Sequence, residues 1–181
     1  MRVDKIAHPG PECWFALHVR PRSEKAIATA VQQKGFEEFL PLYECRRAWS
    51  DRTKWVKLPL FPGYLFCRLN PHDRLSLLTI PGVLHIVTAG NIPVVIDESE
   101  IMAIRMVTAS GLQVEPFPFL KIGERIRLEH GPLAGLEGHL VEVRNQSRLV
   151  VSVSVLKRSV AVEVAREWVA PLGGQRSLAI Q

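Results

Sequence analysis

Histidine and cysteine are the residues of this sequence that could bind a metal ion or act as nucleophiles. The six histidines are His8, His18, His72, His85, His130 and His139, and the three cysteines are Cys13, Cys45 and Cys67. They form no H-x-x-x-H pair and no mixed His/Cys group at the spacing of a metal site. The sequence also lacks a G-x-S-x-G elbow, a P-loop and a dinucleotide fingerprint. We therefore expect no catalytic residue, no metal and no cofactor, and a protein that is not an enzyme.

The cysteines and the first residues bear on the cellular compartment. The cysteines are odd in number and form no C-x-x-C pair, which is a poor basis for a disulfide framework. Residues 1–11 are polar and contain no apolar run, so they match neither a signal peptide nor a membrane span. We expect a loose leader over 1–11, no membrane contact and a reducing, cytoplasmic location.

Basic side chains gather in two places and could bind phosphate. The chain has 23 Lys and Arg against 18 Asp and Glu, and a pI near 9.4, which suits a polyanionic partner. The first group, at the start of an expected helix, is Arg20, Arg22 and Lys25. The second, in a hairpin-like stretch, is Arg46, Arg47, Arg52, Lys54 and Lys57.

Trp49 and Trp55 bracket the second basic group. Basic residues interleaved with aromatic residues suit single-stranded DNA, through phosphate contacts and base stacking. The alternative is an ordinary solvated hairpin, in which Glu44 and Asp51 balance part of the charge.

The elements that position these residues fall into two parts. In the first part, residues 12–113, we expect strands over 14–19, 39–47, 55–60, 64–69 and 83–87, and helices after Ser23, over 73–79 and after Asp97. Gly35 and Gly111 should end the first and last helices, and Glu100 should complete a capping box with Asp97. This pattern predicts an α+β domain with an antiparallel sheet and flanking helices.

The composition changes after Gly111. Pro116 and Pro118 favour extended backbone, so we expect a linker over 114–120. Short β-rich runs follow over 125–128, 139–143, 149–155 and 160–164, separated by turns. They predict a small all-β, SH3-like barrel over 121–173 and a tail over 174–181.

Three stretches resemble known motifs in order and spacing. Residues 14–18 read W-F-A-L-H, residues 59–66 read P-L-F-P-G-Y-L-F, and residues 131–138 read G-P-L-A-G-L-E-G. The first two resemble the opening strand and the F-P-G-Y signature of the NusG amino-terminal (NGN) domain. The third resembles a KOW motif, followed by the β-rich run at 148–155. The chain is thereby identified, over roughly 12–172, as similar to the NusG family of transcription elongation factors.

Within that family the chain resembles a specialised branch. Residues 40–43, 49–52 and 59–64 are similar to the UpxY group of operon-specific antiterminators, to which RfaH is related. General NusG has a Phe-Gly step in a KOW-domain loop that contacts Rho and a small-subunit ribosomal protein. Leu156-Lys157 stands here instead, which argues against Rho binding. We expect the second partner to bind the loop residues Val155, Leu156 and Arg158, and we expect this domain to stay a β-barrel because 149–155 is strongly β-branched.

The resemblance also implies a polymerase-binding surface. The family binds the clamp helices of the largest subunit of bacterial RNA polymerase through an apolar concavity, and relatives approach the non-template DNA strand. The residues implied here are Tyr64, Phe66, Phe61, Trp14 and His18. The alternative is that these aromatic residues form the domain core, which we retain for Trp14. We expect a monomer that favours processive elongation or antitermination, and keep a KOW-type RNA- or ribosome-binding protein as the alternative function.

Overall fold

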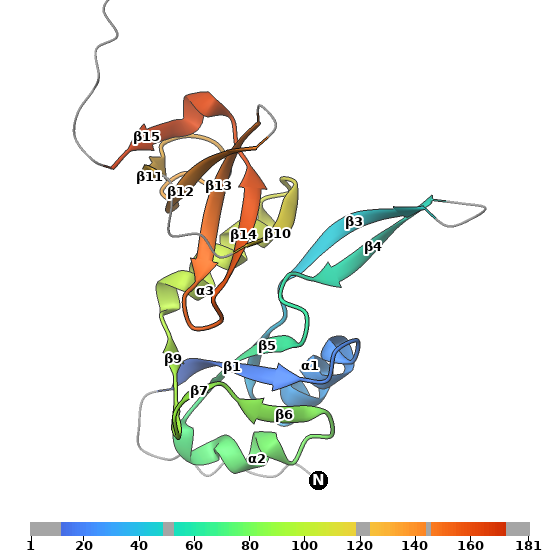
Figure 1. Ribbon diagram of the computed structural model, residues 1–181. Coiled ribbons are helices and arrows are strands. Elements are labelled where there is room, and N and C mark those ends of the chain that lie inside the picture. Colours follow the sequence, from blue (N-terminus) through green and yellow to red (C-terminus); the bar gives the residue numbers. More distant parts are fainter. Residues whose placement is uncertain (1–11, 49–52, 119–123, 144–145, 173–181) are drawn as a thin grey trace, which may run out of the picture.

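The computed structural model describes residues 12–48, 53–118, 124–143 and 146–172. They form two antiparallel sheets with a helix, α3 (Glu98–Ala109), between them, and a two-stranded hairpin that extends to one side (Figure 1). This arrangement confirms the predicted α+β class.

The first sheet holds the aromatic stretches. Its strands are β1 (Cys13–Val19), β2 (Glu37–Phe39), β5 (Tyr64–Leu69), β6 (Val83–Ile86) and β9 (Val95–Ile96). Their order is β2-β5-β1-β6, and β9 also pairs with β1. Because side chains alternate along a strand, β1 has two different faces. Phe15 and Leu17 pack with helix α1, whereas Trp14 and Ala16 belong to the core that includes α3.

Helix α1 (Glu24–Gln33) begins and ends where the sequence predicts. Ser23 is the N-cap residue, and Ile27 and Val31 are buried against the sheet at helical spacing. Gly35 follows the helix with φ +83°, a conformation that glycine adopts without a Cβ penalty. The predicted helix over 73–79 is a short pair, η1 (Pro71–Asp73) and α2 (Arg74–Leu78).

Helix α3 departs from its predicted capping box. The Asp97 carboxylate accepts a hydrogen bond from the Ser99 N–H at 2.7 Å, as an N-cap should. Hydrogen bonds from the Ser99 side chain and from its backbone N–H lower the pKa of Asp97. The Glu100 carboxylate, however, accepts the backbone N–H of Ser154 in the second sheet, at 3.2 Å and 3.3 Å. A side chain expected to act within its own helix therefore bonds to a segment 54 residues away.

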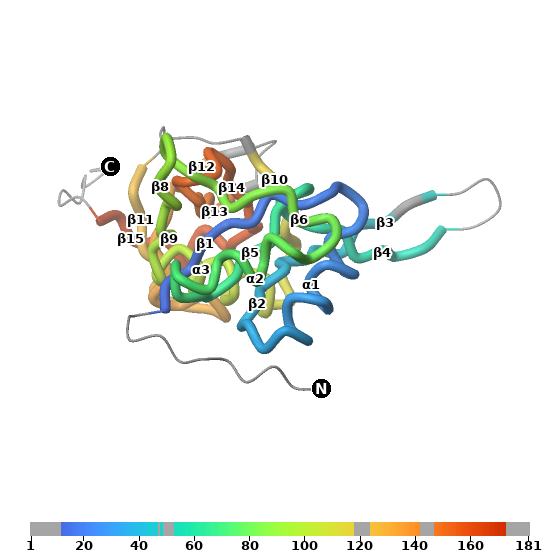
Figure 2. The backbone as a smooth tube through the Cα atoms, turned by 90° about the horizontal axis from the view of Figure 1, so that it is seen from below, coloured from blue at the N-terminus to red at the C-terminus, as the bar shows by residue number. Residues whose placement is uncertain are grey.

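The hairpin consists of β3 (Leu42–Ala48) and β4 (Thr53–Pro59), and Figure 2 shows it extending from the rest of the chain. Residues 49–52, including the predicted site residue Arg52 and Trp49, lie outside the described residues. A second, very short hairpin joins β7 (Thr88–Ala89) to β8 (Ile92–Pro93), which the sequence did not predict.

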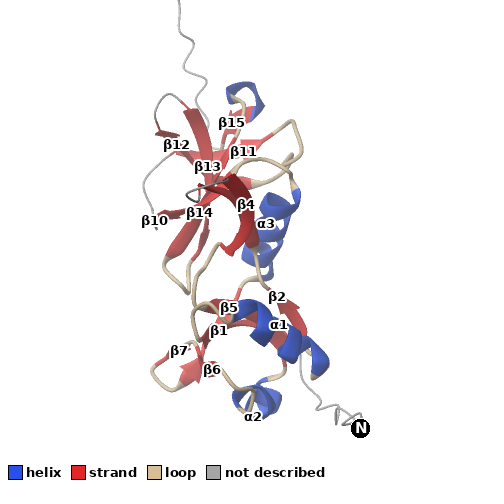
Figure 3. Cartoon of the chain, turned by 90° about the vertical axis from the view of Figure 1, so that its right-hand side faces the viewer, coloured by secondary structure: helices blue, strands red, loops and turns tan. Residues whose placement is uncertain are grey.

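The second sheet contains the predicted β-rich runs. Its strands are β10 (Val114–Pro118), β11 (Glu124–Leu128), β12 (Glu137–Val143), β13 (Gln146–Val153), β14 (Arg158–Glu163) and β15 (Val169–Pro171), with η2 (Arg166–Trp168) before the last. Their order is β10-β14-β13-β12-β11-β15. Figure 3 shows this sheet on one side of α3 and the first sheet on the other. The second part is therefore all-β, as predicted.

The expected linker is a strand over all of its described length, Val114–Pro118. Strand β10 is the edge strand of the second sheet and pairs with β14 from Val114 to Pro118. Glu163 donates its N–H to the Gln113 carbonyl at 3.2 Å. Since bonding partners alternate along an antiparallel pair, Pro116 and Pro118 face the free edge. The two prolines thus sit where a strand needs no N–H, and residues 119–123 lie outside the described residues.

The glycines of the predicted KOW turn have two different roles. Gly131 and Gly135 have φ of +81° and +88°, as expected for a tight turn. Gly138, the third glycine of the motif, lies within β12 and not in the turn. A Cβ there would lie 2.6 Å from the Val150 carbonyl oxygen, so Gly138 permits close approach of two strands.

Candidate binding surfaces

The predicted aromatic row forms across β1 and β5. The register places Ala16 opposite Phe66 and His18 opposite Tyr64. These side chains share one face of the sheet, because residues two apart in a strand point to the same side. The His18 ring lies 5.2 Å from the Tyr64 ring and 4.9 Å from the His85 ring on β6.

The row is buried at one end and accessible at the other. Phe66, Phe61 and Trp14 are 0%, 1% and 2% exposed, because they pack into the shared core. Phe66 contacts Phe39 at 6.1 Å and Phe61, edge to face, at 5.6 Å. Tyr64 and His18 are only partly buried. Of the five predicted polymerase-binding residues, these two can reach a partner without a change in the core.

Arg105 on α3 covers the buried end of the row. Its guanidinium carbon lies 5.0 Å from the Trp14 ring and 5.2 Å from the Phe39 ring, and it pairs with Glu37 at 2.8 Å. Such cation–π contacts strengthen where water is excluded. Burial raises the pKa of the neighbouring Glu38 carboxyl, and Arg105 and a backbone bond partly oppose that shift. The sequence analysis missed Arg105, since nothing in its local pattern marks it.

The turn before β5 is held by a buried carboxylate. Gly63 has φ +80°, and its carbonyl accepts the Val19 N–H at 2.8 Å. Its own N–H donates to Glu24 on α1 at 3.0 Å, and Glu24 is 5% exposed. These bonds connect the F-P-G-Y turn to both neighbouring elements and thereby fix the start of the strand that carries Tyr64. Glu24 was also missed, because the sequence gives no sign that this acid is buried.

The second sheet covers the accessible end of the row. The Arg158 guanidinium carbon lies 5.2 Å from the Tyr64 ring. Val155 and Leu156 are half-buried against the core cluster that contains residues of both sheets. These three residues were expected on an exposed partner loop. Arg158 is exposed, but all three lie on the side of the second sheet that contacts the first part, because the turn between β13 and β14 packs there.

The first basic group is exposed and touches the hairpin. Arg20, Arg22 and Lys25 all have exposed side chains. Arg22 adopts φ +69°, which is uncommon for a residue with a Cβ. The Lys25 ammonium donates to the Lys57 carbonyl on β4 at 3.0 Å. The structure therefore brings the two predicted basic groups together.

The hairpin presents its side chains on two faces. Trp55 pairs with Arg46 and Lys57 with Glu44, so these four share one face. Lys54 lies on the opposite face, in register with Arg47, whose side chain is outside the described residues. Arg46 and Lys54 are exposed, and Trp55 is 69% exposed. Lys57 lies 3.6 Å from Glu44.

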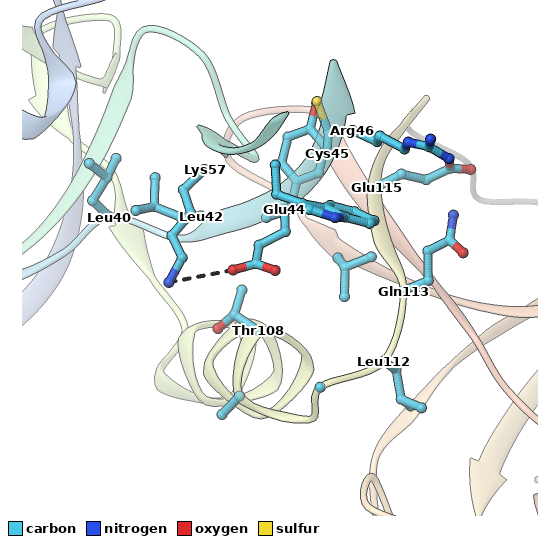
Figure 4. A pocket seen from close by; sticks show the side chains of 15 residues that line it. Leu40, Leu42, Glu44, Cys45, Arg46, Lys57, Thr108, Leu112, Gln113 and Glu115 are labelled. Atoms are coloured by element: carbon cyan, nitrogen blue, oxygen red, sulfur yellow. Dashed lines mark ion pairs between the residues drawn. The ribbon is translucent and has the colours of Figure 1, made fainter. Parts of the chain in front are cut away.

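A groove of about 780 Å³ separates the hairpin from the end of α3 and the start of β10 (Figure 4). Its hairpin wall consists of Leu40, Leu42, Tyr43, Glu44, Cys45, Arg46, Trp55 and Lys57. The opposite wall includes Thr108 and residues 111–115. A volume in the range of roughly 300–1,000 Å³ is typical of ligand sites.

The described residues contain neither a candidate metal site nor a helix that could span a membrane. Among the described residues, no three His, Cys, Asp or Glu side chains gather as a metal site would require. Within those ranges no helix is long and apolar enough to cross a bilayer. Cys13 and Cys45 are partly buried, Cys67 is buried, and these three described residues form no disulfide.

The fold and the surfaces together define an α+β binding protein with an aromatic sheet face and a basic hairpin. A sequence model of the family described as "Transcription termination factor nusG" matches residues 12–105, just over half of the chain. The chain belongs to the NusG family.

Relatives are found in several bacteria, and each is named transcription termination/antitermination protein NusG. The Buchnera aphidicola protein is 33% identical over 83% of this chain and 91% of its own length. The Thermus thermophilus protein is 26% identical over 83% of this chain and 94% of its own length. The Rickettsia bellii protein is 24% identical over 84% of this chain and 86% of its own length. These names support a role as a transcription factor.

A solved structure shares the fold. "Domain interaction in Thermotoga maritima NusG" aligns with a TM-score of 0.55 and 19% identity, over 90% of this chain and 98% of that chain. At this identity the likeness concerns the fold alone.

Proposed function

We propose that this chain is a transcription elongation factor that binds the clamp helices of the largest subunit of bacterial RNA polymerase. The observation that carries the proposal is the aromatic row of β1 and β5, which ends in the accessible pair Tyr64 and His18. Partly exposed aromatic side chains on a rigid sheet are the residues that dominate interface energies. Membership of the NusG family supports polymerase as the partner.

The buried residues of the row have a supporting role in this proposal. Phe66 and Phe61 pack edge to face beneath the surface and hold β5 in position. Tyr64 then makes direct contact with the clamp helices. Binding that favours the elongating conformation of polymerase shifts its equilibrium away from paused states without any chemical step. The net effect is processive elongation or antitermination.

The basic surface extends the proposal to DNA. Arg20, Arg22, Lys25 and Arg46 are exposed cations on neighbouring elements, and they suit the phosphates of the non-template strand in the transcription bubble. The loop that contains Val155, Leu156 and Arg158 binds a second partner, such as a small-subunit ribosomal protein, once this loop has moved away from the first sheet. The absence of a Phe-Gly step at Leu156-Lys157 disfavours Rho.

The proposal includes a specialised role, in which the protein acts on particular operons. It rests on the similarity of residues 40–43, 49–52 and 59–64 to the UpxY group. The competing function is an RNA- or ribosome-binding protein that uses the second sheet. The aromatic row argues against it, because binding through the second sheet alone requires no such row on the first.

Binding of the full chain to purified bacterial core RNA polymerase tests the proposal. We expect Tyr64→Ala to weaken binding by about 2 kcal/mol, on the order of 30-fold in Kd, because an aromatic anchor is removed. Leu75→Ala is the matched control, since Leu75 is 69% exposed and lies on α2, which packs on the other face of the sheet. Equal affinities of the two variants, or no binding of the wild type at micromolar concentration, would refute the proposal.

A further inference from the structure

The groove beside the hairpin joins features that the sequence showed only separately. Lys25 of the first basic group donates to the Lys57 carbonyl of the second, so the cations form one strip that runs from the start of α1 onto β4. Beyond Lys57, the same hairpin face carries Trp55 and Arg46 in direct cross-strand register. The strip therefore leads to an exposed indole with a guanidinium beside it.

The charge on this strip is strongly positive. Its exposed cations are Arg20, Arg22, Lys25, Lys57 and Arg46. The exposed acid on the described parts of the same elements is Glu44, which lies 3.6 Å from Lys57. Glu24 is at the start of α1 but is buried and bonded to the Gly63 N–H. A polyanion is the ligand that this distribution attracts.

The far wall of the groove supplies polar groups and confines the ligand. Figure 4 shows Gln113 and Glu115 across from Glu44 and Arg46, and the Glu115 carboxylate is paired with Arg148. Thr108 lies at the end of α3 in the same wall. An aromatic platform, cations along one side and hydrogen-bonding groups opposite are what a single strand needs, since its bases are unpaired and can turn into a groove.

We propose that Trp55 is a base-stacking platform, and that single-stranded DNA follows the strip from Arg20 and Lys25 across Lys57 into the groove. This deepens the proposed DNA contact and rests on that part of the proposed function. Stacking on Trp55 holds one base, while Arg46 and Lys57 contact the flanking phosphates. Lys54 takes no part, because it lies on the other face of the hairpin and does not line the groove.

Fluorescence anisotropy with the full chain and a labelled oligothymidine of about 12 nucleotides tests this inference. We expect Trp55→Ala to weaken binding roughly 5- to 100-fold and Trp55→Phe to retain most of the affinity. Leu75→Ala is the control for the loss of an equally exposed apolar side chain, since Leu75 and Trp55 are both 69% exposed. Affinity is measured between about 50 mM and 200 mM salt.

The pair Lys57→Ala and Lys54→Ala tests the direction of the strip. Both variants remove one positive charge from β4. We expect only Lys57→Ala to lower the slope of log K against log salt, by about 0.7 for the lost phosphate contact. Equal effects of the two variants, or a Trp55→Ala affinity like that of Leu75→Ala, would overturn the inference.

Two further outcomes would also overturn it. One is the absence of oligothymidine binding by the wild type at low salt, and the other is tighter binding of the matching RNA than of DNA. The assay contains no polymerase, so its failure is distinguishable from failure of clamp-helix binding. If the chain binds polymerase but not oligothymidine, the Trp55 inference is refuted and the clamp-helix proposal stands.

Discussion

Tyr64 and Phe66 show how two residues of one strand face can differ in function. Both point to the same side of β5, yet Phe66 is fully buried between Phe39 and Phe61, while Tyr64 remains partly exposed beside His18. Alternation along the strand identifies the shared face, but it cannot say where the core ends. The difference in burial predicts that replacing Phe66 mainly lowers the stability of the fold, whereas replacing Tyr64 mainly weakens polymerase binding.

Phe66→Ala should lower the free energy of unfolding by about 3–5 kcal/mol, because it leaves a cavity among packed rings. Tyr64→Ala should cost clearly less, since its ring is only partly buried and loses the Arg158 and His18 contacts and part of its packing on the core. Urea titration followed by circular dichroism measures both values. If Tyr64→Ala proved as destabilising as Phe66→Ala, Tyr64 would be a core residue and not a docking residue.

Elements with strong local signals were predictable from the sequence. The strand over 64–69 has the predicted bounds, and α1 begins after its cap at Ser23 and ends before Gly35. Those signals are local: alternation, an N-cap residue and a glycine with positive φ. Alternation along the strand also places Tyr64 and Phe66 on one face of β5.

Features that depend on distant contacts were not predictable. Strand β10 was expected to be a linker because its prolines lack an N–H, and only its pairing with β14 makes them edge residues. Strands β9 and β15 are two and three residues long, too short for a periodic pattern. Glu100 has the spacing of a capping box, but its partner is the Ser154 N–H in the second sheet. Arg105 and Glu24 likewise act on residues far along the chain.

The turn before β12 allows a matched test of how the second sheet is built. Gly131 and Gly135 both have positive φ, but a Cβ on Gly131 would lie 2.8 Å from the Trp168 ring, whereas none of the described atoms lies within 4 Å at Gly135. Gly135→Ala should cost about 1–2 kcal/mol of unfolding free energy for the left-handed backbone alone. Gly131→Ala should cost about 1–3 kcal/mol more, because Trp168 must move.

Thermal and urea unfolding of the two glycine variants measure that difference. Equal losses of stability would mean that Trp168 yields freely, and that its packing on the turn contributes little to the second sheet.

At the scale of the whole molecule, the second sheet rests on the surface that is proposed to bind polymerase. The Glu100 carboxylate holds the Ser154 N–H, and Arg158 lies over Tyr64. Val155 and Leu156 also pack against the core cluster that contains residues of both sheets, so opening exposes apolar surface as well as breaking these two contacts. Polymerase binding therefore competes with closure, and the apparent Kd rises as the open fraction falls.

The double variant Glu100→Ala, Arg158→Ala should open the molecule. We expect a larger radius of gyration in small-angle X-ray scattering and a several-fold tighter apparent Kd for polymerase, because closure no longer competes. The double variant Arg127→Ala, Glu137→Ala is the control, since it also removes one basic and one acidic side chain, but from a pair inside the second sheet that lies at 2.7 Å. An expanded molecule with unchanged polymerase affinity would mean that the second sheet does not mask the docking surface.

Site-specific photo-crosslinking from position 64 tests the central claim most directly. The full chain, with p-benzoylphenylalanine in place of Tyr64, is irradiated with bacterial elongation complexes, and the crosslinked peptides are identified by mass spectrometry. The account predicts crosslinks to the paired clamp helices of the largest subunit, and none there from the same group at Leu75. Crosslinks from position 64 to RNA or to ribosomal proteins, with the clamp helices unmodified, would contradict it.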